Sequence, residues 1–129
     1  MSCRVMMVDD NDNDLLFTRL MLQRSGVGYD VLAFERAEHA LRHLSDTADH
    51  GVDLILLDIN MPVMNGFAFL GAFEDLPQAH RDGVSVLLLT SSSDPADQAR
   101  AARFACVKGY LTKPLDKATA AGLVSYLPG

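Results

Sequence analysis

The sequence predicts an α/β fold built on a doubly wound, five-stranded parallel sheet, and three observations support this prediction. Five short runs are mainly apolar, with Val, Leu, Ile and Met prominent in them, which is typical of strands that are buried on both faces. Segments with a helical spacing of apolar residues lie between these runs. The two kinds of segment alternate along the 129-residue chain, and such alternation requires right-handed crossovers and helices on both sides of the sheet.

Each predicted strand has four to six residues, the usual length of a strand in a globular protein. Turn residues or polar residues bound each run. The five runs are Cys3–Val8, Tyr29–Phe34, Val52–Leu57, Val84–Leu89 and Gly109–Thr112.

Four of the predicted helices are recognised by an apolar stripe, in which residues recur three or four positions apart. The first helix, Asp14–Arg24, ends at Ser25-Gly26, which is a helix-stop signal. The third follows Gly66, and the fifth is expected to run to Leu127. The stripes are Leu16 and Leu20; Ala37, Ala40, Leu41 and Leu44; Phe67, Leu70 and Phe73; and Ala120, Leu123, Val124 and Leu127.

The remaining helix, the fourth, is recognised by its start. Ser93-Asp94-Pro95 reads as a cap followed by proline at the first helical position, and the helix is expected to extend to about Ala105. Its small residues Ala96, Ala99 and Ala102 favour close packing against the sheet over a partner surface.

The composition excludes several classes of protein. Eleven Lys and Arg against seventeen Asp and Glu leave a net charge of −6, which argues against binding to nucleic acid or to an anionic membrane. No apolar run approaches the ~18 residues of a membrane helix. The start, Met1-Ser2-Cys3-Arg4, lacks the layout of a signal peptide, and two cysteines are too few for a disulfide framework. We therefore expect one cytoplasmic domain over residues 1–129.

Polar residues stand where the predicted strands end. Asp9 and Asp10 follow the first run, Asp58 follows the third, Thr90 the fourth, and Lys113 the fifth. In open parallel sheets the ligand site lies outside the carboxyl ends of the strands. The sequence therefore predicts that these side chains converge there.

Three carboxylates in one place raise one another's pKa, so either one of them is protonated or a cation lies among them. Hard oxygen ligands with open positions suit Mg²⁺, and a carboxylate beside that ion can attack a phosphoryl group. Lys113 and Thr90 would then contact phosphoryl oxygens.

Taken singly, each residue has a simpler structural interpretation. Asp10 could cap the next helix, Thr90 could be an ordinary strand residue, and Lys113 could be a surface lysine. Their joint placement at four strand ends favours a site. His39 and His43 lie four residues apart on one helix, but no third ligand accompanies them, so a solvated face is the better interpretation.

The chain resembles the receiver domain of two-component response regulators, such as the chemotaxis response regulator, over essentially its whole length. The stretch from Asp58 to Gly66 is the most specific part of this resemblance. The matching segments are Val5-Met6-Met7-Val8-Asp9-Asp10, Leu56-Leu57-Asp58-Ile59-Asn60-Met61-Pro62-Val63-Met64-Asn65-Gly66, Leu88-Leu89-Thr90-Ser91 and Gly109-Tyr110-Leu111-Thr112-Lys113-Pro114.

The resemblance implies a flavodoxin-like (βα)5 receiver fold and a phosphorylation site. It makes Asp58 the phosphoacceptor, with Mg²⁺ held by Asp9, Asp10, Asp58 and the backbone carbonyl of Asn60.

The resemblance also implies how the site works as a switch. Lys113 pairs with the phosphate, and the peptide bond before Pro114 is cis. Thr90 is the switch hydroxyl, and Tyr110 is the switch aromatic that moves between outward and inward rotamers. Phosphorylation adds about −1.5 to −2 of charge, which draws Thr90 inward and frees space for the ring.

The implied function is a phosphoryl-accepting signalling switch. Its donor would be a phosphohistidine of a sensor kinase or of a phosphotransfer protein. No output domain is expected, so the chain would act on a downstream protein through its fourth helix, fifth strand and fifth helix, a surface that could also form a homodimer.

Two alternative functions are less consistent with the sequence than this switch. A small Mg²⁺ phosphohydrolase would need a second acid where Asn60 stands. A degenerate interaction module is disfavoured by the intact set of Asp10, Asp58, Thr90 and Lys113.

Overall fold

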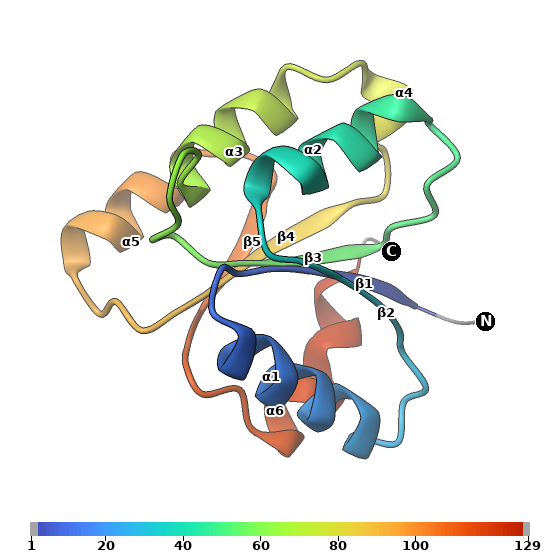
Figure 1. The fold of residues 1–129 in the computed structure, drawn as a ribbon, viewed down its shortest axis with the longest axis vertical. Helices are drawn as coiled ribbons and strands as arrows, with labels where there is room; N and C mark the ends of the chain where they lie inside the picture. Colours follow the sequence, from blue (N-terminus) through green and yellow to red (C-terminus); the bar gives the residue numbers. More distant parts are fainter. Residues whose placement is uncertain (1–2, 128–129) are drawn as a thin grey trace.

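A parallel five-stranded sheet forms the centre of the computed structural model, which describes residues 3–127 (Figure 1). Residues 1–2 and 128–129, which the expected domain includes, lie outside the described residues. The strand order is β2-β1-β3-β4-β5, so the fold class is as predicted. The strands are β1 (Arg4–Val8), β2 (Asp30–Phe34), β3 (Leu54–Leu57), β4 (Ser85–Thr90) and β5 (Val107–Thr112).

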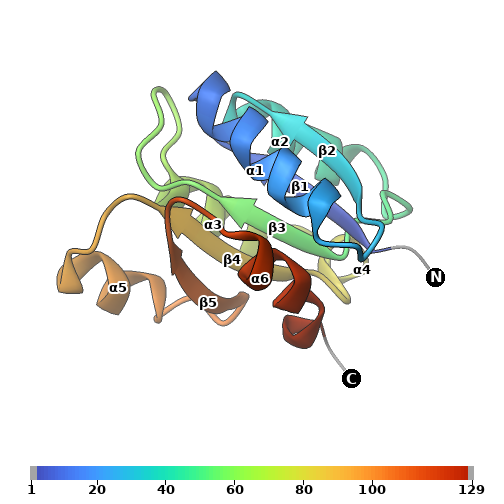
Figure 2. The same cartoon turned by 90° about the horizontal axis from the view of Figure 1, so that it is seen from below.

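Helices cover both faces of the sheet. Figures 1 and 2 show α2 and α3 on one side and α1 and α6 on the other. The order in which the strands are added reverses between β1 and β3, which is where doubly wound sheets bind their ligands. The helices are α1 (Asp12–Arg24), α2 (Ala37–Asp46), α3 (Gly66–Glu74), α4 (Gln78–Arg81), α5 (Pro95–Ala101) and α6 (Lys117–Ala121), followed by a 3-10 helix (Gly122–Tyr126).

The central strands are buried on both faces, as their apolar sequences indicate. Alternate residues of a strand point to opposite sides, so Met6 and Ile55 belong to the core beneath α2 and α3. Their neighbours Met7 and Leu56 belong to the core beneath α1 and α6. This double burial holds the carboxyl ends of β1 and β3 rigidly side by side.

The buried face of α1 differs from the predicted one. Leu15, Thr18 and Leu22 are buried, whereas Leu16 is 59% exposed. The helix carries apolar residues around most of its circumference, so their spacing alone does not select the face that meets the sheet. Tertiary packing makes that selection, and it places Leu15 and Leu22 in the core on this side of the sheet.

The fourth predicted helix, α5, ends at Ala101 rather than near Ala105. Beyond it Phe104 packs against the core, and the Cys106 N–H donates to Glu74 Oε2 at 3.1 Å, which draws the chain toward α3. The expectation that the alanines of α5 pack against the sheet is wrong. Ala96, Ala99 and Ala102 are exposed, and Ala101 is the buried alanine of this helix.

The C-terminal α-helix is also shorter than expected. The α-helix α6 ends at Ala121, and the 3-10 helix that follows repeats every three residues. Ala120 and Leu123 therefore stay buried while Val124 is 41% exposed. The short helix α4 was not predicted, and it has no buried residues that could have revealed it.

Among residues 3–127, no helix is both long enough and apolar enough to cross a membrane. Both cysteines are free thiols. Burial, with a contribution from Glu74, raises the pKa of Cys106 to about 12, so this thiol stays protonated and unreactive at neutral pH.

Candidate functional site

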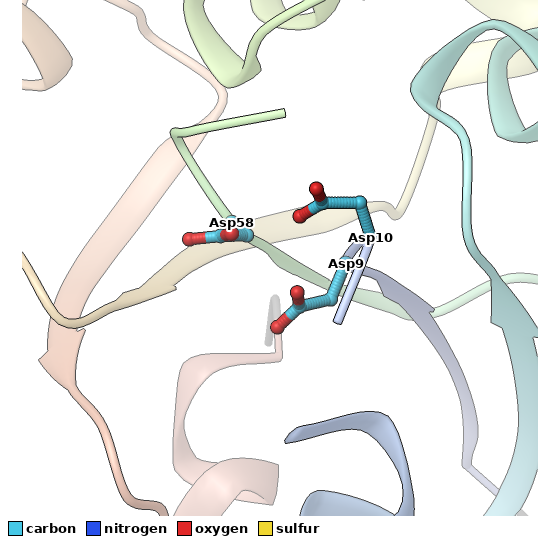
Figure 3. A group of neighbouring side chains, drawn as sticks. All are labelled: Asp9, Asp10 and Asp58. Atoms are coloured by element: carbon cyan, nitrogen blue, oxygen red, sulfur yellow. The ribbon is translucent and has the colours of Figure 1, made fainter. Parts of the chain in front are cut away.

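Three carboxylates converge where β1 and β3 end (Figure 3). Asp9 and Asp10 follow β1, and Asp58 follows β3. One oxygen of each carboxylate lies within 4.8 Å of the others. The sequence therefore correctly predicted which acids come together, although they are separated by almost fifty residues of chain.

Backbone hydrogen bonds from neighbouring strands position the site residues. The Asp9 N–H donates to Phe34 O at 3.1 Å, and the Asp58 N–H donates to Val8 O at 2.9 Å. The Lys113 N–H donates to Thr90 O at 2.8 Å. Each of these residues thus extends the backbone hydrogen bonding of the sheet by one residue beyond its strand. This bond fixes the position of the backbone from which the side chain points into the site.

Asp58 lies in an environment that disfavours its charge. The residue is 7% exposed, and its Oδ1 accepts one hydrogen bond from the Ile59 N–H at 2.9 Å. Burial is the main reason that the pKa of Asp58 rises to about 6, and the charge of Asp9 adds to it while Lys113 opposes it. A bound cation would relieve both causes of this shift.

The ammonium group of Lys113 lies among three carboxylates. Its Nζ is 2.6 Å from Asp9 Oδ2, 2.8 Å from Asp14 Oδ2 and 3.7 Å from Asp58 Oδ2. Burial by itself would lower the pKa of Lys113, but the hydrogen bonds to Asp14 and Asp9 outweigh burial and raise it. Lys113 is therefore charged and faces the carboxylate cluster.

Thr90 and Tyr110 both form hydrogen bonds with the backbone of Ser92. The Ser92 N–H donates to Thr90 Oγ1 at 3.2 Å, and the Tyr110 hydroxyl donates to Ser92 O at 2.8 Å. Thr90 is fully buried, while Tyr110 is half-buried and packs against the core. Thr90 and Tyr110 are therefore linked through the backbone of a single residue.

The acidic cluster fits a hard divalent cation. Its ligands are carboxylate oxygens, Asp10 is exposed and open to solvent, and Asp9 and Asp58 are buried. Asn60 is exposed in the loop two residues beyond Asp58, and its part in binding a metal stays a prediction. The peptide bond between Lys113 and Pro114 is cis, as the resemblance implied.

The sequence did not reveal that Asp14 contacts Lys113. This residue lies on the first turn of α1 and contacts Lys113, which is 99 residues further along the chain. Asp10 is not the cap of α1, because Asn11 takes that position and accepts the Asp14 N–H. Asn11 and Asp14 have the spacing of a capping box, in which the capping residue is followed three positions later by an acid. This spacing could have identified the start of α1 from the sequence.

Gly66 allows the loop after β3 to close against Asp58. A Cβ atom at Gly66 would lie 2.5 Å from the Asp58 carbonyl oxygen and 2.9 Å from Ile59 Cα. We therefore expect Gly66→Ala to lower the free energy of unfolding by about 1–3 kcal/mol, because backbone would have to move. Urea denaturation measures this loss.

Gly71 provides the matched control on the same helix, since nothing lies within 4 Å of a Cβ built there. Gly71→Ala should raise the free energy of unfolding by about 0.5–1 kcal/mol, because alanine favours the helix. Equal effects of the two substitutions would show that helix propensity, and not the contact with Asp58, decides the outcome at Gly66.

The comparisons with known proteins agree with this geometry. A family model described as the response regulator receiver domain matches residues 5–124. PilH of Pseudomonas aeruginosa is 29% identical over 117 residues, which cover 90% of this chain and 89% of PilH. The solved structure of a response regulator receiver protein from Dyadobacter fermentans has a TM-score of 0.85 at 31% identity, covering 97% of this chain and 96% of that one.

Other relatives are much longer than this chain. A protein of Vibrio cholerae named as a probable cyclic di-GMP phosphodiesterase is 31% identical over 113 residues, which are 88% of this chain but 24% of that protein. In two further relatives the matching part is 16% and 49% of the protein. What these proteins share with this chain is the matched domain, and the chain belongs to the response regulator receiver domain family.

Proposed function

We propose that this chain is a phosphoryl-accepting signalling switch and that Asp58 is its phosphoacceptor. One observation carries the proposal: a buried carboxylate, two further carboxylates, a lysine ammonium and a buried threonine hydroxyl lie together at one end of the sheet. These are the parts that phosphoryl transfer to a carboxylate requires.

In the proposed step, an Asp58 carboxylate oxygen attacks the phosphorus of a phosphohistidine. The P–N bond breaks, its electron pair stays on the imidazole nitrogen, and an acyl phosphate forms on Asp58. Lys113 stabilises the added negative charge, and Thr90 hydrogen-bonds a phosphoryl oxygen. When bound by Asp9, Asp10 and Asp58, together with the Asn60 carbonyl, Mg²⁺ would neutralise part of the phosphoryl charge.

The proposed donor is a sensor histidine kinase or a histidine phosphotransfer protein, and the proposed target is another protein. The surface formed by α5, β5 and α6 lies beside Tyr110, whose contact with Ser92 links it to the site. We propose that this surface binds the target or a second copy of the chain. The free thiols support a reducing, cytoplasmic location, and the acidic charge argues against direct contact with nucleic acid.

We further propose that the chain is a switch and not a turnover enzyme. Asn60 occupies the position at which a phosphohydrolase of this chemistry would carry a second acid. An amide does not protonate a leaving group, so dephosphorylation should be slow and varied phosphate esters should not be hydrolysed.

Incubation with acetyl phosphate and Mg²⁺ tests the proposal. Intact-mass measurement should find one phosphoryl group per chain, stable in acid, labile in base and absent when EDTA is added. Absence of any adduct would favour a module that only binds other proteins. Rapid multiple turnover of phosphate esters would favour a phosphohydrolase.

A further inference from the structure

Asp14 gives Lys113 a partner outside the proposed phosphorylation site. The Lys113 Nζ lies 2.6 Å from Asp9 Oδ2 and 2.8 Å from Asp14 Oδ2, but 3.7 Å from Asp58 Oδ2. Asp9 and Asp14 therefore hold the ammonium group closer to themselves than to the phosphoacceptor. Asp14 is not one of the three carboxylates that could hold a metal ion.

The start of α1 explains why the Asp14 carboxylate is available. In a capping box, an acidic side chain at the third helical position accepts the N–H of the capping residue. Here the capping residue is Asn11, and its N–H donates to Asp9 Oδ1 at 3.0 Å instead. Because Asp9 takes over this role, Asp14 can extend to the loop after β5 and bind Lys113.

The contact between Asp14 and Lys113 engages the positive charge that a phosphoryl group on Asp58 would need. The Lys113 side chain is 13% exposed and that of Asp14 is 41% exposed, so water screens their attraction only in part. A phosphoryl group on Asp58 adds about −1.5 to −2 of charge and needs the positive charge of Lys113. Asp14 neutralises that charge and adds a negative charge of its own beside the ammonium group.

We propose that Asp14 is a positioning residue that competes with the phosphoryl group for Lys113 and so weakens phosphoryl binding at Asp58. This inference rests on the proposed function. It gives α1 a part in setting how readily Asp58 is phosphorylated, through a residue that is not one of the three clustered carboxylates.

Binding of beryllofluoride in the presence of Mg²⁺ tests the proposal on the full chain. Asp14→Asn should bind beryllofluoride about two- to fivefold more tightly than the wild type, since a partly exposed ion pair is lost. Asp14→Glu, which keeps the charge, should return toward the wild-type affinity.

Asp12→Asn is the matched control. Asp12 lies on the same turn of α1, but its carboxyl group contacts Glu35, whose pKa it raises by a hydrogen bond and by its charge. This variant removes the same charge without touching Lys113, so its affinity for beryllofluoride should change less than that of Asp14→Asn. Equal tightening in both variants would overturn the proposal in favour of a general charge effect, and weaker binding by Asp14→Asn would show that Asp14 assists Lys113.

A nuclear magnetic resonance signal of the Lys113 ammonium group gives a readout independent of phosphorylation. In the free protein, Asp14→Asn should shift this signal and Asp12→Asn should not. If the wild type fails to bind beryllofluoride at all, the proposed function fails. If the wild type binds it and Asp14→Asn binds it no more tightly, only the inference about Asp14 fails.

Discussion

Replacing Asp58 by Asn is expected to abolish the phosphoryl adduct that the wild type forms with acetyl phosphate and Mg²⁺. An amide oxygen is a poor nucleophile, so the rate of labelling should fall by more than about a thousandfold, the scale seen when an enzyme loses its nucleophile. Asn retains an oxygen that can accept the Ile59 N–H, the bond that Asp58 makes at 2.9 Å, so the fold should persist. Intact-mass measurement after timed incubation gives the rate.

Asp46→Asn is a suitable control for this substitution. Asp46 is an exposed residue at the end of α2, and the change removes the same charge without altering the candidate site. Its labelling should match that of the wild type. Undiminished labelling of Asp58→Asn would show that another residue accepts the phosphoryl group, and circular dichroism would confirm that both variants are folded.

The second large effect concerns stability and pH in the absence of Mg²⁺. The pKa of Asp58 is about 6 in the folded protein, raised from its ordinary value of 3.8 first by burial and then by the charge of Asp9. A raised carboxyl pKa means that the folded state holds the proton more tightly than the unfolded state. The stabilisation is complete below pH 3.8 and is lost as the pH rises through about 6.

The free energy that Asp58 costs the folded protein at pH 7 is on the order of 1–3 kcal/mol. Asp58→Asn should therefore be more stable than the wild type by about this amount at pH 7, with the difference shrinking toward zero near pH 4. Urea denaturation in EDTA across this pH range measures the difference. Acids remote from Asp58 cancel in this comparison, so the difference reports on Asp58 and on its interaction with the charges of Asp9 and Lys113.

Binding of Mg²⁺ should offset the loss of stability that ionised Asp58 causes in the wild type at pH 7. An ion that binds the ionised cluster in the folded state stabilises the wild type by mass action, whereas Asp58→Asn lacks one of the ligands. At pH 7, added Mg²⁺ should therefore raise the midpoint of thermal unfolding of the wild type more than that of the variant. A stability difference that does not change between pH 4 and pH 7 would contradict the assignment of the raised pKa to Asp58.

The central strands β1, β3 and β4 could be predicted because their residues are apolar on both faces. The expectation of burial on both faces is wrong for the edge strands β2 and β5, which are only partly buried. The buried faces and ends of the helices were harder to predict, because the apolar residues there do not select one face or one end. In α1, both Leu15 and Leu16 are apolar, and only tertiary packing places Leu15 inward. In α5, the contacts that Phe104 and Cys106 make with the core and with α3 end the helix early, and no local signal indicated them.

By itself, the sequence determined how the five strands alternate along the chain with every helix except α4, and the sheet edge on which Asp9, Asp10, Asp58, Thr90 and Lys113 meet. These follow from local periodicity and from the rule that parallel strands end at one edge. The resemblance to receiver domains came from the sequence too, through its motifs. Only the tertiary structure decided how the charges are paired. Asp14 and Lys113 are 99 residues apart, and their contact depends on how α1 and the loop after β5 pack across the sheet.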